Sequence, residues 1–353
     1  MIIPSENTLV NPRKFDAWAE KKQLNTMMSD KMRRARMDMR AERMSQCADQ
    51  IEITLCPKCG RYEISKAILC HDRLCPVCSW RLSLKRFAQM MQIVRTLLDD
   101  HPTAPWSFMT LTVRNCAPDQ LHYTLRRMAE AYNRMRQRKA FKGKIAGFAR
   151  TVEVTYNAST NELHPHYHIL IMWDAAADPL SDGARLLNAW IASCRDGLIA
   201  SYKGQHIEDV DGSGVDDLSH DDLLRQSTAE DLTRSVLETF KYTQKATDIL
   251  KMPIPTFRAF ADNMQGIRAL SFGGLIKAYA AKLGINEDED DASIDAPFSV
   301  CPYCRNPDLT SAVYKWAMSE HSYLRIDPTT SAVVGDPVKS VNKRQKRQRR
   351  RTN

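Results

Sequence analysis

The sequence contains no run of about 18 apolar residues, the length at which a segment becomes a candidate membrane-spanning helix. Residues Met1–Val10 also lack the basic start and the apolar segment of a secretory signal peptide. With neither feature present, we expect a cytoplasmic protein. At 353 residues the chain can bury a full core, and we expect one large domain with an appended module.

Outside its last residues the chain has little excess of either charge. The formal net charge is +9, and the seven cations of Lys343–Arg351 account for most of it, which leaves +2 for the remainder. Such a tail has too little apolar surface to fold alone, so residues 339–353 are predicted to be disordered. A polyanion is its natural partner, bound with release of counterions, and a tail that only aids solubility is the alternative.

Ten cysteines without an export signal favour metal ligation over disulfides. Two C-x2-C pairs are separated by fifteen residues: Cys56 with Cys59, and Cys75 with Cys78. In this spacing two tight turns present four thiolates to one tetrahedral ion, so the pattern predicts a Zn²⁺ site within residues 51–100. Cys70 and His71 lie inside the loop, and either could replace a member of the outer pair.

A third C-x2-C pair, Cys301 and Cys304, follows an acidic stretch at residues 287–291 that reads as a disordered linker. The pair offers only half of a tetrahedral site. His321 could add one ligand, but others would have to come from elsewhere in the chain. A separate C-terminal zinc site therefore stays open.

Three of the nine histidines fall within five residues of the stretch Glu162–Ile171. In an extended strand, side chains alternate between faces, so His164, His166 and His168 share one face and Tyr167 points the other way. Neighbours on that face are about 6.6 Å apart along the strand, close enough for two imidazoles to bind one cation. A polar, solvent-facing strand edge is the alternative interpretation.

A preceding strand supplies a candidate third ligand. Residues 148–156 and 164–173 read as partners joined by a turn at residues 157–161. If the hairpin folds symmetrically about Ser159 and Thr160, Glu153 lies opposite His166, about 5 Å away. A slip of one residue would turn Glu153 to the other face.

The order of predicted elements is that of a ferredoxin-like α+β unit with an antiparallel sheet. The elements are a strand at 106–113, a helix at 119–140, the two strands at 148–156 and 164–173, a helix at 182–194 and a strand at 198–202. Residues 205–231 are expected to form a loop. The expected segments are a basic helical region (1–50), a zinc-binding module with a helix (51–100), the main domain (101–284), a linker with the C-terminal cysteine pair (285–338) and the tail.

Two predicted helices carry basic faces. Residues 13–50 have Lys31–Arg36 at their centre, and residues 119–140 carry six cations opposite an apolar stripe. Both are candidate phosphate-binding surfaces, with a solvated helix surface as the alternative.

A later helix, predicted at residues 229–247, combines a carboxylate, a phenol and two amines. Glu238 and Tyr242 are four residues apart and therefore neighbours on one helix face, with Lys241 and Lys245 close by. The alternative interpretation is a buried tyrosine that fills the core.

These motifs together resemble those of plasmid rolling-circle replication initiators of the HUH endonuclease superfamily. The segment Thr110–Thr112 with Asn115 resembles their first motif, His164–His168 their second, and Glu238–Tyr242 with Lys245 their third. The cysteine pairs and residues 268–274 are also similar to members of this group. The resemblance covers roughly residues 56–278, in the family's order.

The resemblance implies a ferredoxin-like HUH core in a bacterial cytoplasmic enzyme that nicks and rejoins plasmid DNA. It implies that His166 and His168 hold a divalent metal, Mg²⁺ or Mn²⁺, although His164 precedes the usual pair and which two of the three histidines bind stays open. Glu153 remains the third candidate ligand from the hairpin register. Tyr242 would be the nucleophile, and Glu238 would take the place of a second tyrosine. Candidate DNA contacts are Lys241, Lys245, Thr112 and Asn115. Host helicase and polymerase are the expected protein partners.

Two other functions stay open. A transposase of the related kind would use the same chemistry on different DNA ends. A zinc-dependent nucleic-acid-binding regulator would bind DNA without metal-dependent cleavage.

Overall fold

The computed structural model describes residues 12–210, 231–240, 245–289, 292–294 and 299–334. The chain divides into two units, Met1–Arg81 with Asp291–Asn353, and Leu82–Asp290. Each unit contains one antiparallel sheet together with helices, so the fold is α+β. No described helix is both long and apolar enough to span a membrane.

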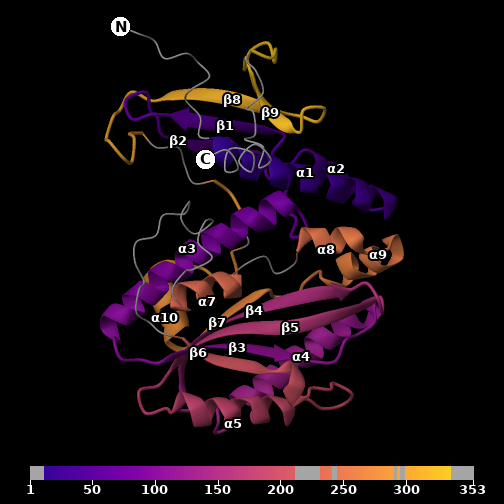
Figure 1. Ribbon diagram of the computed structural model, residues 1–353, viewed down its shortest axis with the longest axis vertical. Helices are drawn as coiled ribbons and strands as arrows, with labels where there is room; N and C mark the ends of the chain where they lie inside the picture. The colour runs from indigo at the N-terminus through magenta and orange to yellow at the C-terminus, as the bar shows by residue number, and fades with distance from the viewer. Residues whose placement is uncertain (1–11, 211–230, 241–244, 290–291, 295–298, 335–353) are drawn as a thin grey trace, which may run out of the picture. The chain divides into compact units, whose positions relative to one another are not determined.

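The sheet of the first unit joins strands from both ends of the chain, in the order β2-β1-β8-β9 (Figure 1). The strands are β1 (Gln50–Leu55), β2 (Tyr62–Ala67), β8 (Thr310–Ala317) and β9 (Ser322–Ile326). Strand β1 pairs with β8 over its whole length, from Gln50 opposite Lys315 to Leu55 opposite Thr310. The segment after the acidic linker is thus part of the N-terminal unit, although the sequence suggested a segment of its own.

The helical region at the N-terminus is two helices and not the one expected over residues 13–50. Helix α1 (Pro12–Arg34) ends where Arg36 adopts a left-handed backbone conformation with φ 59°, and α2 (Asp38–Ser45) follows. Their shared core is rich in methionine, with Met28, Met32 and Met44 fully buried. The basic composition hid this core, because apolar methionines alternate with the cations along the segment.

The sheet of the second unit has the order β6-β3-β5-β4-β7, and every neighbouring pair is antiparallel. The strands are β3 (Trp106–Thr112), β4 (Ile145–Asn157), β5 (Glu162–Trp173), β6 (His206–Val210) and β7 (Leu270–Gly273). The β4–β5 hairpin has the predicted register, with Glu153 directly opposite His166.

Helices cover both faces of this sheet (Figure 1). Strand residues Phe108 and Leu170 belong to one buried cluster with side chains from α3 (Pro76–Asp100), α7 (Asp231–Phe240) and α10 (Gly274–Lys282). On the opposite face, Tyr167 packs against Tyr132 and Trp190, which belong to α4 (Leu121–Arg136) and α5 (Pro179–Ile191). The remaining elements are the short helices η1 (Pro118–Gln120), η2 (Tyr202–Gly204), α8 (Ala246–Lys251) and α9 (Ile254–Asn263).

Two predictions for the region after α5 were wrong. Residues 198–202 do not form the fourth strand of the unit, and the strand is β6, in the segment expected to be a loop. Strand β6 lies at the edge of the sheet and is mostly exposed, so its sequence lacks the apolar alternation of a half-buried strand.

The predicted helix at 229–247 is also interrupted. Lys245 has an extended backbone, and its carbonyl accepts hydrogen bonds from the amides of Asp248 and Ile249, so α8 begins after it. Asp248 in the first turn favours this start, because a carboxylate stabilises a helix N-terminus.

Gly274, the first residue of α10, directly follows β7 at a position where no side chain can be accommodated. Its φ is +58°, and a Cβ atom there would lie 2.0 Å from the Ala146 carbonyl oxygen. We expect Gly274→Ala to lower the free energy of unfolding by about 3 kcal/mol, from backbone strain plus overpacking. Gly266→Ala is the matched control, since Gly266 has φ +72° with open space around it, and should cost about 1 kcal/mol. Urea unfolding measures both, and equal losses would contradict the steric argument.

Candidate active site

Three adjacent strands present polar side chains on one face of the second sheet. His164, His166 and His168 project from β5, and across β4 the register places Thr151 opposite His168 and Glu153 opposite His166. On the other side of β5, Thr110 and Thr112 of β3 lie opposite His168 and His166. Because alternate residues share a face, the two pairings bring these side chains together.

Glu153 is the centre of this group. One carboxylate oxygen, Oε2, lies 3.1 Å from Nε2 of His166 and 2.7 Å from Nε2 of His168. All three residues are buried, with 5 to 8% of their surface exposed. Burial raises the pKa of the Glu153 carboxyl, but the hydrogen bonds and charges of His166 and His168 outweigh it and hold that pKa well below its usual range.

Both histidines are held through their other ring nitrogen. His166 Nδ1 lies 3.2 Å from the His164 carbonyl oxygen, to which only an N–H can donate. His168 Nδ1 lies 3.3 Å from the Thr110 hydroxyl, and its ring stacks on Phe108 with 5.4 Å between ring centroids. With the proton kept on Nδ1, the Nε2 lone pair would become a metal ligand once an ion replaces the Nε2 proton that is donated to Glu153. Two imidazole nitrogens and one carboxylate oxygen could therefore hold one divalent cation.

His164 has a different partner. Its Nδ1 donates to the side-chain oxygen of Asn115 over 2.8 Å, and its ring is not part of the group formed by Glu153, His166 and His168. Burial, and then the neighbouring charge of His166, lowers the pKa of His164. The structure thus connects His164 to the segment after β3, while its ring centroid lies 5.4 Å from that of His166.

Helix α7 ends beside this face of the sheet. The Thr151 hydroxyl donates to the Thr239 carbonyl over 2.8 Å, and Thr151 is the cross-strand partner of His168. Glu238 is half-buried near the end of α7, and Lys245 is exposed. Tyr242 and Lys241 lie outside the described residues.

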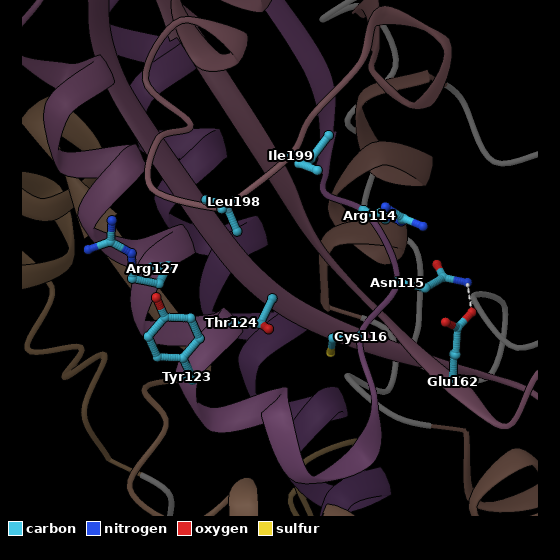
Figure 2. Close-up of a pocket in the computed structure, with 10 residues that line it drawn as sticks. Arg114, Asn115, Cys116, Tyr123, Thr124, Arg127, Glu162, Leu198 and Ile199 are labelled. Atoms are coloured by element: carbon cyan, nitrogen blue, oxygen red, sulfur yellow. Dashed lines mark hydrogen bonds between the residues drawn. The ribbon is translucent and has the colours of Figure 1, made fainter.

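The predicted DNA contacts Thr112, in β3, and Asn115, which follows β3, differ in environment. Thr112 is buried, and its hydroxyl donates to the Gly204 carbonyl and lies 3.3 Å from Gln205 Nε2, so its polar groups are engaged within the protein and its contact with DNA stays a prediction. Asn115 instead lines a cavity of about 310 Å³. Figure 2 shows Asn115 and Glu162 pointing toward each other on one side of this cavity, with Tyr123 and Arg127 on the other.

Three of the six cations on the basic side of α4 and the residues after it are engaged within the protein. Arg134 and Arg138 both donate to backbone carbonyls that follow α5, and Arg127 pairs with Asp196 and Glu130. These three arginines attach α4 to the segment after α5, whereas Arg126, Arg136 and Lys139 are exposed, so a phosphate-binding surface stays a prediction for those three. Sequence periodicity could not distinguish the two roles, because each leaves the cations off the apolar stripe.

The cysteines form two groups of four in the first unit, and not the single group that the spacing predicted. Cys75 and Cys78 lie with Cys70 and Cys47, while Cys56 and Cys59 lie with Cys301 and Cys304. The β1–β2 hairpin puts the Cys56 pair at its turn, whereas the Cys75 pair starts α3. Cys47 has no C-x2-C partner, so no spacing pattern in the sequence indicated it.

The comparisons with known proteins agree with these motifs. A family model described as "Replication protein" matches residues 61–324. A protein named "Protein rep" from Bacillus amyloliquefaciens is 27% identical over 282 residues, 75% of this chain and 82% of its own. Another "Protein rep", from Lentilactobacillus hilgardii, is 26% identical over 328 residues, 88% of this chain and 95% of its own.

A third relative of that name, from Streptococcus pneumoniae serotype 2 (strain D39), is 27% identical over 257 residues, 70% of this chain and 73% of its own. No solved structure matches the chain. Plasmid rolling-circle Rep proteins, which the motifs of this chain resemble, are members of the replication protein family. Because the family model covers well over half of the sequence, this chain belongs to the same family.

Proposed function

We propose that the chain initiates rolling-circle plasmid replication by nicking and rejoining one DNA strand at the origin. The observation that carries this proposal is the convergence of Nε2 of His166, Nε2 of His168 and Oε2 of Glu153 on one sheet face. Helix α7, which leads to Tyr242 in the sequence, ends beside that face. Membership of the replication protein family supports the role in replication.

We assign this site to a ferredoxin-like HUH endonuclease core. The order strand, helix, strand, strand, helix, strand from β3 to β6, with the strands arranged β6-β3-β5-β4, supports the assignment. Strand β7 then extends this sheet beyond β4.

The ligands at the site suit Mg²⁺ or Mn²⁺. A carboxylate and two neutral imidazoles leave open positions on the ion for phosphate oxygens, unlike a closed thiolate cage. When bound, the ion would polarise the scissile phosphate and stabilise the charge that develops on it. Glu153, His166 and His168 would hold it, and Thr110 and the His164 carbonyl would orient the two imidazoles.

Tyr242 carries the covalent step in this proposal. Its phenolic oxygen attacks the phosphorus atom, the bond to the 3′ oxygen breaks, and the 3′ oxygen leaves with a proton as a free hydroxyl. The 5′ phosphate stays on Tyr242 as an ester, so the energy of the broken bond is kept. The free 3′ hydroxyl can then prime synthesis or attack the ester and reseal the strand.

Glu238 ends the cycle as a general base. A carboxylate can accept a proton from water as that water attacks the phosphotyrosine, which releases the strand by hydrolysis. Lys241 and Lys245 contact DNA phosphate, and their positive charge favours the phenolate form of Tyr242. Asn115 contacts DNA from the cavity that it lines with Glu162 and Arg127.

Zn²⁺ occupies the cysteine group of Cys47, Cys70, Cys75 and Cys78 in this proposal. Three sulfur-to-sulfur distances of 3.5 to 3.7 Å agree with about 3.8 Å for tetrahedral zinc bonded to sulfur at about 2.3 Å. Asn25 donates to Cys75 Sγ over 3.2 Å, as an outer hydrogen bond to a metal-bound thiolate would. The DNA partner in this proposal is the plasmid origin. Host helicase and polymerase would then act on the nicked DNA.

The metal assignment predicts that Glu153→Gln weakens Mn²⁺ binding at least tenfold, since the anionic ligand is lost. Calorimetric titration of the purified chain measures this affinity. Glu208→Gln is the matched control, because Glu208 also hydrogen-bonds a histidine, His206, but both side chains are exposed on the edge strand. Unchanged Mn²⁺ affinity in Glu153→Gln would contradict the assignment.

The nucleophile assignment predicts that Tyr242→Phe neither nicks supercoiled DNA carrying the origin nor forms a covalent adduct with it. Nicking is scored on agarose gels, and the adduct as a DNA-dependent shift on denaturing protein gels. Tyr279→Phe removes a hydroxyl that bonds to Asp100, at the end of α3, and should retain both activities. An adduct that survives in Tyr242→Phe would refute the assignment. If wild-type chain binds origin DNA without metal-dependent cleavage, the regulator interpretation is the correct one.

The termination role predicts a different defect in Glu238→Gln. This variant should nick and form the adduct at nearly the wild-type rate but accumulate that adduct, because hydrolysis lacks its base. Loss of the adduct over time on a single-stranded oligonucleotide measures the step. Wild-type hydrolysis in Glu238→Gln would exclude Glu238 as the base.

A further inference from the structure

The two sequence segments of the first unit contain matching turns. Each turn starts with the residues Cys-Pro and carries its second cysteine three positions after the first, at Cys56–Arg61 and at Cys301–Asn306. The first cysteine's amide donates to the carbonyl five residues later, over 2.9 Å in one turn and 2.8 Å in the other. Its carbonyl accepts from the residue four positions later, over 2.9 Å in both. The two turns are therefore equivalent supports for a pair of thiols.

The backbone conformation of the turns agrees as well. The residue after the second cysteine is left-handed in both turns, Gly60 with φ 69° and Arg305 with φ 58°. The left-handed backbone conformation is unfavourable for a residue with a side chain, such as Arg305. Its occurrence at the position equivalent to Gly60 indicates that the cysteine pair requires this turn geometry. Turns of this kind direct both sulfur atoms of a C-x2-C pair to one point.

The sulfur atoms of the two turns meet. Cys56 Sγ lies 3.5 Å from Cys304 Sγ, and Cys59 Sγ lies 3.7 Å from Cys301 Sγ. All four sulfur atoms lie within 4.8 Å of one another. A disulfide would need about 2.05 Å between two sulfurs, whereas tetrahedral zinc places them about 3.8 Å apart. The distances match a shared ion and not a pair of disulfides.

Side chains around the sulfurs complete the connection between the turns. Asn306 Nδ2 lies 3.7 Å from Cys56 Sγ and is aimed at it as a donor. The Arg61 guanidinium lies over the Tyr303 ring, 4.1 Å from its centroid, and the Tyr303 hydroxyl donates to Glu63 over 2.9 Å.

We infer that Cys56, Cys59, Cys301 and Cys304 bind a second structural Zn²⁺, separate from any ion held by Cys75 and Cys78. This ion joins cysteines that are 242 and 248 residues apart in the sequence, beside the pairing of β1 with β8. It therefore attaches the C-terminal hairpin β8–β9 to the N-terminal hairpin β1–β2. The inference does not depend on the proposed nicking function, because none of its ligands belongs to the nicking site.

The first test is the zinc content of untagged, purified chains, measured by mass spectrometry of the metal. Wild type should contain two Zn²⁺ per chain, and Cys301→Ser/Cys304→Ser should contain one. Cys116→Ser/Cys194→Ser is the matched control, because these two cysteines lie outside both groups, and it should keep two. His321→Ala should also keep two. An equal zinc content in wild type and in Cys301→Ser/Cys304→Ser would overturn the inference.

A second measurement needs no variant, so a folding defect cannot obscure it. Wild-type chain reconstituted with ¹¹³Cd²⁺ should give two NMR resonances, both at the shift of an ion with four thiolate ligands. A single such resonance would overturn the inference. In either experiment, loss of the second site with normal DNA nicking would leave the proposed function intact, which keeps the two claims distinguishable.

Discussion

The pairing register of β4 with β5 is the constraint on which the proposed site depends. Side chains alternate along a strand, so one residue of slip would move Glu153 to the face of α4 and α5 while His166 and His168 stayed where they are. The hairpin turn and the buried aromatic residues on the opposite face fix this register. Tyr167, between the two histidines, packs against Tyr132 and Trp190, and that packing holds the histidines on the other face.

Much of the proposed metal site could be predicted from the sequence because it is local. The three histidines alternate within five residues, and a short turn determines which residue of β4 faces His166. The supporting contacts were not predictable in the same way. Thr110, which holds His168, and Thr151, which binds α7 through Thr239, are ordinary strand residues until tertiary contacts give them partners.

The cysteine groups show where a spacing rule fails. The distance between two C-x2-C pairs in the sequence says nothing about a third pair more than two hundred residues away. Here β8 pairs with β1 and brings Cys301 and Cys304 to the β1–β2 turn, beside Cys56 and Cys59. Cys75 and Cys78 are grouped instead with Cys47 and Cys70. Edge strand β6 was missed for a related reason, because an exposed strand needs no apolar alternation.

The side-chain groups that could hold metal ions are divided between the two units. The cysteine groups lie in the unit that contains the sheet β2-β1-β8-β9, and the histidine group lies in the other unit, Leu82–Asp290, whose range also includes Tyr242. The most direct test of the central claim is a crystal structure with bound Mn²⁺, with the ion located by its anomalous scattering. We expect one peak bonded to Glu153, His166 and His168, with His164 still hydrogen-bonded to Asn115. A Mn²⁺ peak elsewhere, with these three residues unbound, would contradict the account.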